Sequence, residues 1–245
     1  MTPGLRRVEQ VMGMPVIVDV RDPAGERTVD DVFAWFHEVD ARFSPYRDDS
    51  DVSRLGRGAM ALEQTHPDVQ WIYARCDELR LATNGYFDVA AVNGDPSGLV
   101  KGWAVDRAGA LLAESGLHNW AVYAGGDILL RGSALPDAVW RVGIQHPRHS
   151  DRVARTLAAN DLAIATSGAY ERGAHIVDPH SGEAPTGLLS VTVTGPDLTL
   201  ADAFATAAFA MGADGPEWTR GLEGYEALSI LADETILRTA GFPPP

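Results

Sequence analysis

Two oxygen-bearing side chains, Asp202 and Thr206, interrupt the small, apolar segment LADAFATAAFAMG at residues 200–212. The segment has the composition of a helix, and residues four apart in a helix lie on one face, so we expect the carboxylate and the hydroxyl side by side. Mg²⁺ prefers oxygen ligands and often shares itself with phosphates, so this spacing is compatible with a magnesium–phosphate site. The alternative is structural: Asp202 would cap the helix, and Thr206 would bond back to the main chain.

A second candidate is the turn Asp95-Pro96-Ser97-Gly98, which leads directly into a predicted helix at 98–116. Small residues at a helix start leave backbone N–H groups open to a ligand, and the helix dipole favours an anion there. Lys101 adds positive charge one turn later. A phosphate site and an ordinary capped helix with a solvated lysine explain this pattern equally well. The sequence contains neither a Walker loop nor a Rossmann glycine fingerprint.

Two further residues, His175 and Tyr46, have side chains that could act in catalysis or in ligand binding. His175 begins an extended run that ends in the turn DPHSG at 178–182. An imidazole there could act as a general base near neutral pH, and a structural histidine is the alternative. Tyr46 lies within a polar loop at 43–58, where an aromatic ring could stack on a flat ligand or simply anchor the loop. Ser167 is not part of a Gly-x-Ser-x-Gly motif, so a serine hydrolase has no support.

Hydrophobic periodicity and turn signals predict the elements that must position these residues. We expect helices at 28–44, 66–85, 98–116 and 200–212. Strands are expected within 119–132 and at 140–146, 163–168 and 188–195, with a strand or hairpin at 8–21 and a terminal hairpin at 225–241. This irregular mixture favours an α+β fold over regular βαβ winding. No composition shift or linker divides the chain, so we predict a single domain over residues 1–245.

Composition excludes several functional classes. The 245-residue chain carries a formal net charge of −14 and has no Lys/Arg-rich run, which argues against a nucleic-acid partner. No stretch approaches the roughly 20 apolar residues of a transmembrane helix, and the start lacks the apolar core of a signal peptide, so we expect a cytoplasmic protein. Cys76 is the only cysteine and lies among apolar residues, which favours a buried structural thiol.

Taken together, the motifs resemble those of the ApbE family, the FAD:protein FMN transferases. They occur in the family's order between Met12 and Gly212: VMGMPV, FSPYRDDSDVSRL, NGYFDVA, DPSGLVKGWAVD, YAGGDILLRG, WRVGIQHP, IATSGAYER, HIVDPHSGEAP and SVTVTGPDLTLADAFATAAFAMG. The resemblance implies a single ApbE-like (T-fold-like) α+β domain with mixed, mainly antiparallel sheets and packed helices. It also implies Mg²⁺-dependent transfer of FMN from FAD to a Thr or Ser hydroxyl of an acceptor flavoprotein, with release of AMP.

The resemblance also implies roles for individual residues of this chain. The Mg²⁺ ligands would be Asp202, Thr206 and the backbone of Gly98, and His175 would be the base that activates the acceptor hydroxyl. The residues expected to contact FAD are Met12, Tyr46, Tyr86, Phe87, Asp88, Asp95, Lys101 and Val177. The chain departs from the family at Ala205, where many members carry a second aspartate. A Mg²⁺-dependent FAD pyrophosphatase and a non-catalytic FAD-binding protein remain alternative functions.

Overall fold

An antiparallel sheet forms the centre of the computed structural model, which describes residues 4–135, 138–168 and 176–245. Among these residues, eight strands pair in the order β1-β2-β3-β4-β7-β8-β9-β10, and every pairing is antiparallel. Their bounds are β1 Leu5–Val11, β2 Met14–Val20, β3 Trp120–Ala124, β4 Asp127–Arg131, β7 Leu162–Gly168, β8 Leu188–Gly195, β9 Glu226–Leu231 and β10 Ile236–Arg238. A separate hairpin joins β5 (Trp140–His146) to β6 (His149–Ala159).

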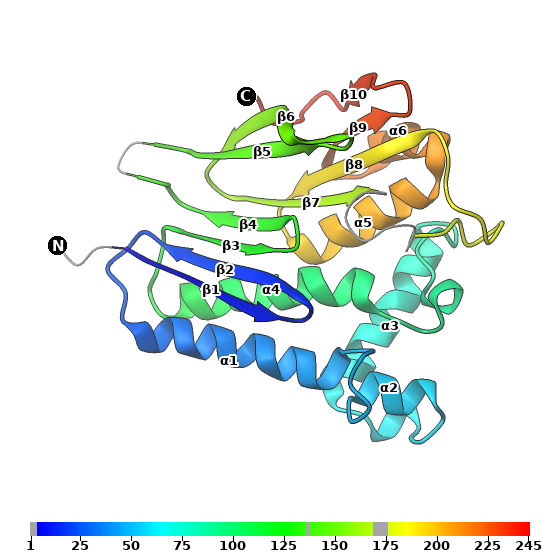
Figure 1. The fold of residues 1–245 in the computed structure, drawn as a ribbon, viewed down its shortest axis with the longest axis horizontal. Helices are drawn as coiled ribbons and strands as arrows, with labels where there is room; N and C mark the ends of the chain where they lie inside the picture. The colour runs from blue at the N-terminus through cyan, green and yellow to red at the C-terminus, as the bar shows by residue number, and fades with distance from the viewer. Residues whose placement is uncertain (1–3, 136–137, 169–175) are drawn as a thin grey trace.

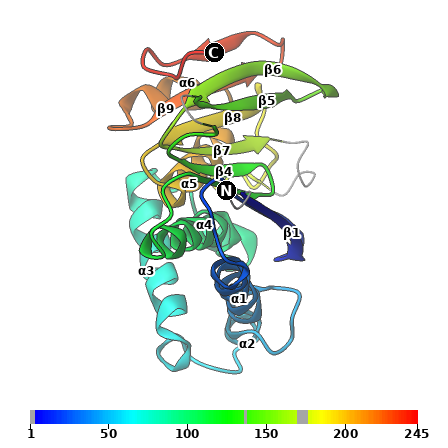
Figure 2. The ribbon, with the colours of Figure 1, turned by 90° about the vertical axis from the view of Figure 1, so that its left-hand side faces the viewer.

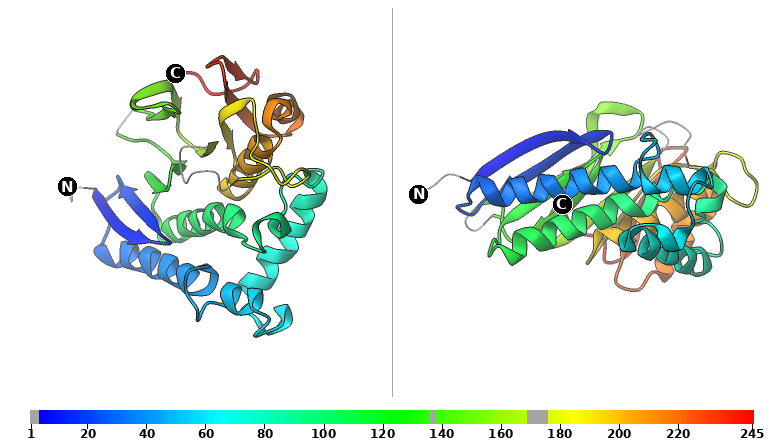
Figure 3. Two further views of the ribbon diagram at one scale, coloured as in Figure 1. Left: turned by 45° about the vertical axis from the view of Figure 1, so that its right-hand side comes forward. Right: turned by 90° about the horizontal axis from the view of Figure 1, so that it is seen from below.

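Helices cover one face of this sheet, and the β5–β6 hairpin covers the other (Figure 1). The α-helices are α1 Glu26–Phe43, α2 Asp51–Gly56, α3 Pro67–Ala82, α4 Ser97–Glu114, α5 Leu198–Ala210 and α6 Gly215–Trp218. Figure 2 shows α4 lying between α1 and the sheet, and Figure 3 shows α1, α3 and α5 arranged around it. Alternate strand residues therefore enter two cores: Val122 packs with the helices, whereas Ala121 packs with the hairpin.

Local sequence explains how several elements begin and end. Met12 and Gly13 both have positive φ, at +55° and +72°, and so form the tight turn that joins β1 to β2. Pro67 lies in the first turn of α3, and Asn84 and Gly85 follow its end with left-handed backbones. The segment at 8–21, predicted as a strand or a hairpin, is therefore a hairpin, and the helix predicted at 66–85 is confirmed.

The prediction for the loop at 43–58 was partly wrong, because its second half contains helix α2. Ser50 caps this helix by accepting a hydrogen bond from the Ser53 N–H at 3.0 Å. Strand β6 was not predicted at all. Its first five residues are exposed and largely polar, so they lack the apolar alternation that marks a half-buried strand. The remaining predicted helices and strands are present, and the α+β class with mainly antiparallel sheets is confirmed.

Two whole-chain expectations can be compared with the described residues. None of the helices in the described ranges combines the length and the apolar character needed to cross a membrane. Cys76 is 2% exposed, which confirms a buried thiol, and burial raises its pKa to about 12.

Candidate functional site

One cavity of about 300 Å³ brings together the predicted site residues. It lies among the start of α4, the middle of α5, the β1–β2 turn and the segments around 43–46, 86–92 and 176–179. Every predicted site residue within the described ranges lines it: Met12, Tyr46, Tyr86, Phe87, Asp88, Asp95, Gly98, Lys101, Val177, Asp202 and Thr206. His175 lies outside the described residues. A volume of this size is typical of a small-molecule site.

Buried charged groups form the base of this cavity. The Lys101 Nζ lies 2.9 Å from the Asp127 Oδ2 and 3.6 Å from the Asp202 Oδ1. The backbone N–H of Gly102 donates a hydrogen bond of 3.2 Å to the Asp202 Oδ2. Asp127 is fully buried and Asp202 is 2% exposed, so the Lys101 ammonium contacts two carboxylates that are shielded from water. The lysine is therefore not the solvated residue of the structural alternative.

Asp127 was missed by the sequence reasoning, although its motif YAGGDILLRG was recognised. It begins β4 directly after Gly125 and Gly126, both of which have positive φ and turn the chain sharply. Its Oδ1 accepts a hydrogen bond of 3.2 Å from the Thr166 N–H on β7. Burial raises the pKa of Asp127, and the neighbouring Lys101 ammonium offsets this only in part. The available signal was an aspartate at the first position of an apolar strand, directly after two glycines.

Asp202 does not cap its helix, so that alternative was wrong. The cap of α5 is Asp197, whose Oδ1 accepts a hydrogen bond of 2.9 Å from the Leu200 N–H. Asp202 lies more than a turn further along and faces the cavity together with Thr206. Ala205 is fully buried in the helix-side core and is not among the residues lining the cavity.

The oxygen atoms of Asp202, Thr206 and Ser167, which line the same cavity, are of the kind that binds a hard cation. The hydroxyl groups of Thr206 and Ser167 lie 3.5 Å apart. A Cβ placed on Gly98 would lie 3.8 Å from the Thr206 Oγ1, so the start of α4 and this hydroxyl are close neighbours. Within the described ranges, no three or more His, Cys, Asp or Glu side chains gather as a metal site. Mg²⁺ commonly uses one or two carboxylates and completes its shell with water and substrate phosphates, so this donor set fits it.

The start of α4 differs in detail from the predicted anion site. The helix begins at Ser97, and the Asp95 Oδ1 accepts a hydrogen bond of 2.9 Å from the Ser97 N–H. That N–H group is therefore engaged within the chain. The Pro96 carbonyl accepts hydrogen bonds from the N–H groups of Leu99 and Val100, so three of the first four N–H groups of the helix are engaged within the chain. Positive charge for an anionic ligand comes from Lys101 rather than from several open backbone groups.

Aromatic and apolar side chains line the rest of the cavity. Tyr46 is 90% exposed, whereas Phe87 is 4% exposed. The Tyr86 ring meets the His180 ring edge-on, with 4.6 Å between the ring centroids. The His180 Nε2 lies 3.0 Å from the Asn84 carbonyl oxygen, which joins the DPHSG turn to the end of α3. These rings could bind a flat aromatic ligand next to the charged base.

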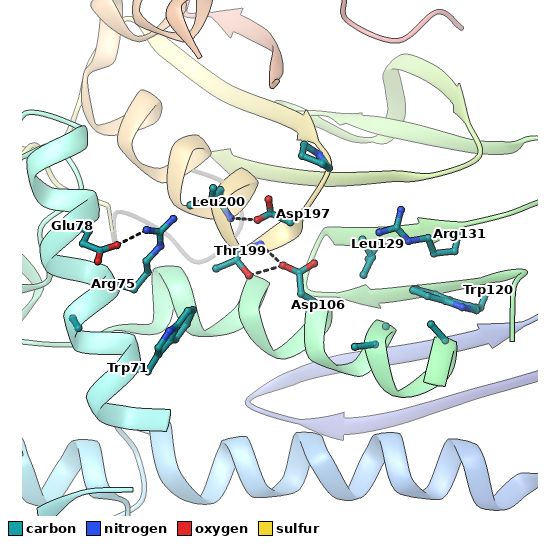
Figure 4. A pocket seen from close by; sticks show the side chains of 15 residues that line it. Trp71, Arg75, Glu78, Asp106, Trp120, Leu129, Arg131, Asp197, Thr199 and Leu200 are labelled. Atoms are coloured by element: carbon teal, nitrogen blue, oxygen red, sulfur yellow. Dashed lines mark hydrogen bonds and ion pairs between the residues drawn. The ribbon is translucent and has the colours of Figure 1, made fainter. Parts of the chain in front are cut away.

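A second cavity, of about 630 Å³, contains none of the predicted site residues (Figure 4). It lies between α3, α4, strands β3 and β4 and the start of α5. Asp106 at its centre accepts hydrogen bonds from the Leu198 and Thr199 N–H groups at 2.9 and 2.7 Å. Together with the Asp197 cap, these bonds fasten the N-terminus of α5, the helix that carries Asp202 and Thr206. This region therefore positions the candidate site.

The model of the ApbE family matches residues 12–94 and 90–229. The FAD:protein FMN transferase of Vibrio cholerae is 34% identical over 165 residues, which cover 63% of this chain and 48% of that protein. The enzyme of the same name from Treponema pallidum is 33% identical over 166 residues, which cover 60% and 46%. The chain thus spans about half the length of these curated relatives.

Solved structures share the fold. The flavin transferase ApbE from Vibrio cholerae superposes with a TM-score of 0.85 at 22% identity, covering 98% of both chains. The ApbE protein from Thermotoga maritima gives 0.83 at 24% identity, again with 98% of both chains covered. At these identities the solved structures establish the fold alone. Membership of the family is established by the match between the family model and the sequence. Since that model spans most of the residues that build the sheet and the cavity, this chain belongs to the ApbE family.

Proposed function

We propose that the protein transfers FMN from FAD to a Thr or Ser hydroxyl of an acceptor flavoprotein in a Mg²⁺-dependent reaction that releases AMP. The observation that carries this proposal is the single cavity lined by Asp202, Thr206 and the other predicted residues of the described ranges. It combines hard oxygen donors and a partly buried lysine with aromatic walls, as a flavin joined to a pyrophosphate requires. The names of the curated relatives support the same reaction.

The reaction requires one new bond and one broken bond. The acceptor oxygen would attack the phosphorus of the FMN half of FAD, and the bond to the bridging oxygen would break, so its electron pair leaves with AMP. The hydroxyl proton would pass to His175, which precedes the cavity-lining residues Ile176 and Val177 in the sequence. General-base assistance of this kind typically contributes about 10²–10⁴-fold. Bound Mg²⁺ would supply electrostatic stabilisation of the charge that develops on the phosphates.

The residues of this chain divide into three groups in this proposal. Asp202, Thr206 and the backbone of Gly98 would hold Mg²⁺. The residues that would bind FAD are Met12, Tyr46, Tyr86, Phe87, Asp88, Asp95, Lys101 and Val177. His175 would act on the acceptor. The cation has a clear electrostatic purpose, because the chain carries a formal charge of −14 and the pyrophosphate is anionic.

The direct test is incubation of the protein with FAD, Mg²⁺ and a candidate acceptor, followed by mass spectrometry of the acceptor. A mass gain of one FMN unit, absent with EDTA, is the expected result. AMP and FMN released without acceptor modification would instead indicate a pyrophosphatase. FAD that stays intact with Mg²⁺ present would indicate a binding protein.

The role of His175 has its own test. His175→Ala should keep FAD affinity within a few fold and lose most transfer, because the contacts proposed for the pyrophosphate come from other residues. His37→Ala is the matched control, since that imidazole is exposed and its Nε2 lies 3.2 Å from a Glu9 carboxylate oxygen away from the cavity. Transfer by His175→Ala at the parental rate would contradict the assignment of the base.

A further inference from the structure

We propose that strand β1 is a self-association surface, through which two copies of this chain join their sheets edge to edge about a two-fold axis at Val8. Among the described residues, β1 is the first strand of the eight-stranded sheet and pairs with β2 alone. Figure 2 shows it at the outer edge of the sheet, beside α1. An unpaired edge strand is a template for a further strand. The inference is independent of the proposed reaction.

The two-residue turn after β1 determines which backbone groups of the strand face outward. The residues that flank such a turn, Val11 and Met14, exchange hydrogen bonds, so every second residue of β1 counted back from Val11 bonds to β2. The N–H and C=O groups of the residues between them, Arg6, Val8 and Gln10, therefore point away from β2. Within the described part of the chain, no hydrogen bond engages these outward groups.

Antiparallel pairing about Val8 satisfies all of these outward groups. Val8 lies opposite Val8 of the second copy, Arg6 lies opposite Gln10, and the residues of each pair exchange N–H to C=O hydrogen bonds. The Val8 side chain is 50% exposed, so the pair at the axis also removes two apolar side chains from water. Strand β10, at the opposite end of the sheet, has three residues against the seven of β1 and offers a shorter ladder.

Charge complementarity selects this register. With the axis at Val8, Arg7 lies opposite Glu9 of the second copy, and symmetry repeats the pair. An axis at Arg7 or at Glu9 would instead place that residue opposite itself, and like charges directly opposite destabilise a sheet. Both side chains are partly exposed, at 36% and 25%, so a second chain can reach them. They already pair with each other and with α1, so charge chooses the register while the backbone hydrogen bonds supply the association.

Helix α1 has a small side chain at the same axis. Asp30 pairs with Arg7, and the His37 Nε2 lies 3.2 Å from a Glu9 carboxylate oxygen, so these two helix residues lie beside β1. Ala34 shares their helix face, and all three helix residues are exposed. Since Val8 lies between Arg7 and Glu9, the axis passes close to Ala34. The two α1 helices can therefore approach there, with Asp30 of one copy facing His37 of the other.

Sedimentation equilibrium over a range of protein concentrations tests the association, and a monomer–dimer equilibrium is the expected result. Val8→Pro removes an outward N–H group and leaves the bonds to β2 intact, so the strand should tolerate it. It should weaken the dimer at least about tenfold, because two hydrogen bonds across the axis are lost. Val8→Thr is the matched control, since it keeps the N–H group and the branched side chain. A parent that stays monomeric at every concentration, or an equally tight dimer of Val8→Pro, would overturn the proposal.

Disulfide trapping tests the register and does not depend on the proline variant. Opposite residues of a hydrogen-bonded pair have Cα atoms about 5.5 Å apart, a distance that a disulfide can span, so Val8→Cys should form a covalent dimer with diamide. Gln10→Cys is the control on the same edge, because its counterpart lies four residues along the strand, about 14 Å away. The native Cys76 is 2% exposed and should not interfere. Failure of Val8→Cys to form a covalent dimer, or equal trapping of both variants, would overturn the proposal.

Discussion

Substitution of Gly102 by alanine tests whether the close approach of α4 and α5 builds the candidate site. A Cβ on Gly102 would lie 2.4 Å from the Leu198 carbonyl oxygen and 3.0 Å from the Thr199 Cα. The helices would have to separate by at least about 0.6 Å to reach a tolerable contact. Asp106 resists this movement, because it already accepts the N–H groups of both α5 residues.

Overpacking of this kind costs about 1–3 kcal/mol. For a chain of this size each kcal/mol lowers the melting temperature by roughly 2–4 °C, so we expect a decrease of about 2–12 °C. Mg²⁺ binding should also weaken, because the Gly102 N–H donates to the Asp202 Oδ2 at 3.2 Å and both groups would shift. Thermal unfolding and calorimetry measure the two effects.

The matched control is Gly56→Ala at the end of α2, where a Cβ would meet nothing within 4 Å. It should be neutral or stabilising by up to about 1 kcal/mol, through helix propensity alone. If Gly102→Ala melts at the same temperature as Gly56→Ala, the contact between α4 and α5 is not the constraint described here.

Three further predictions concern single residues. Asp202→Ala should abolish most Mg²⁺ binding with only a small change in melting temperature. The control Asp197→Ala should cost about 1 kcal/mol of stability through the lost helix cap and leave Mg²⁺ affinity intact. Normal Mg²⁺-dependent cleavage of FAD by Asp202→Ala would exclude Asp202 as a ligand. Burial opposes ionisation of Asp22, but hydrogen bonds from the Asn119 amide and from two backbone N–H groups outweigh it and lower the pKa of Asp22. This carboxylate therefore stabilises the fold above about pH 4 and loses its effect as the pH falls through the lowered value, so Asp22→Ala should cost about 1–3 kcal/mol at pH 7 in urea unfolding, with a smaller difference from the parent below about pH 3. A difference independent of pH would contradict the assignment. Because burial raises the pKa of Cys76 to about 12, its thiol should react with a disulfide reagent at pH 8 only as the protein unfolds, and rapid labelling of the folded protein would show that it is accessible.

Much of the fold could be predicted from local sequence, because the signals are local. Backbone angles that neighbouring residues determine produce the two-residue turn at Met12 and Gly13. They also end helix α3 before Asn84 and Gly85. The longer helices were predicted to within a few residues from their composition and periodicity. Helix α2 and strand β6 were missed because one lies in a strongly polar segment and the other begins as an exposed strand, so neither shows a hydrophobic pattern.

The residue types of the candidate site were also evident in the sequence. The pairing of Asp202 with Thr206 followed from helix geometry, and the order of the motifs indicated the family that the family model then confirmed. By itself, the sequence determined which side chains are available and which of them share a helix face. Their function in FMN transfer stays a prediction.

Only the tertiary structure decided how those side chains are charged and held. Lys101 and Asp127 come from α4 and β4, and the Gly102–Asp202 hydrogen bond joins residues 100 positions apart. Such pairings have no sequence period, because they arise where a helix crosses a sheet and another helix. The burial that raises the pKa of Asp127 is likewise a property of the packed core. A carboxylate in a short motif becomes part of a site only when folding removes water and places one ammonium group beside it.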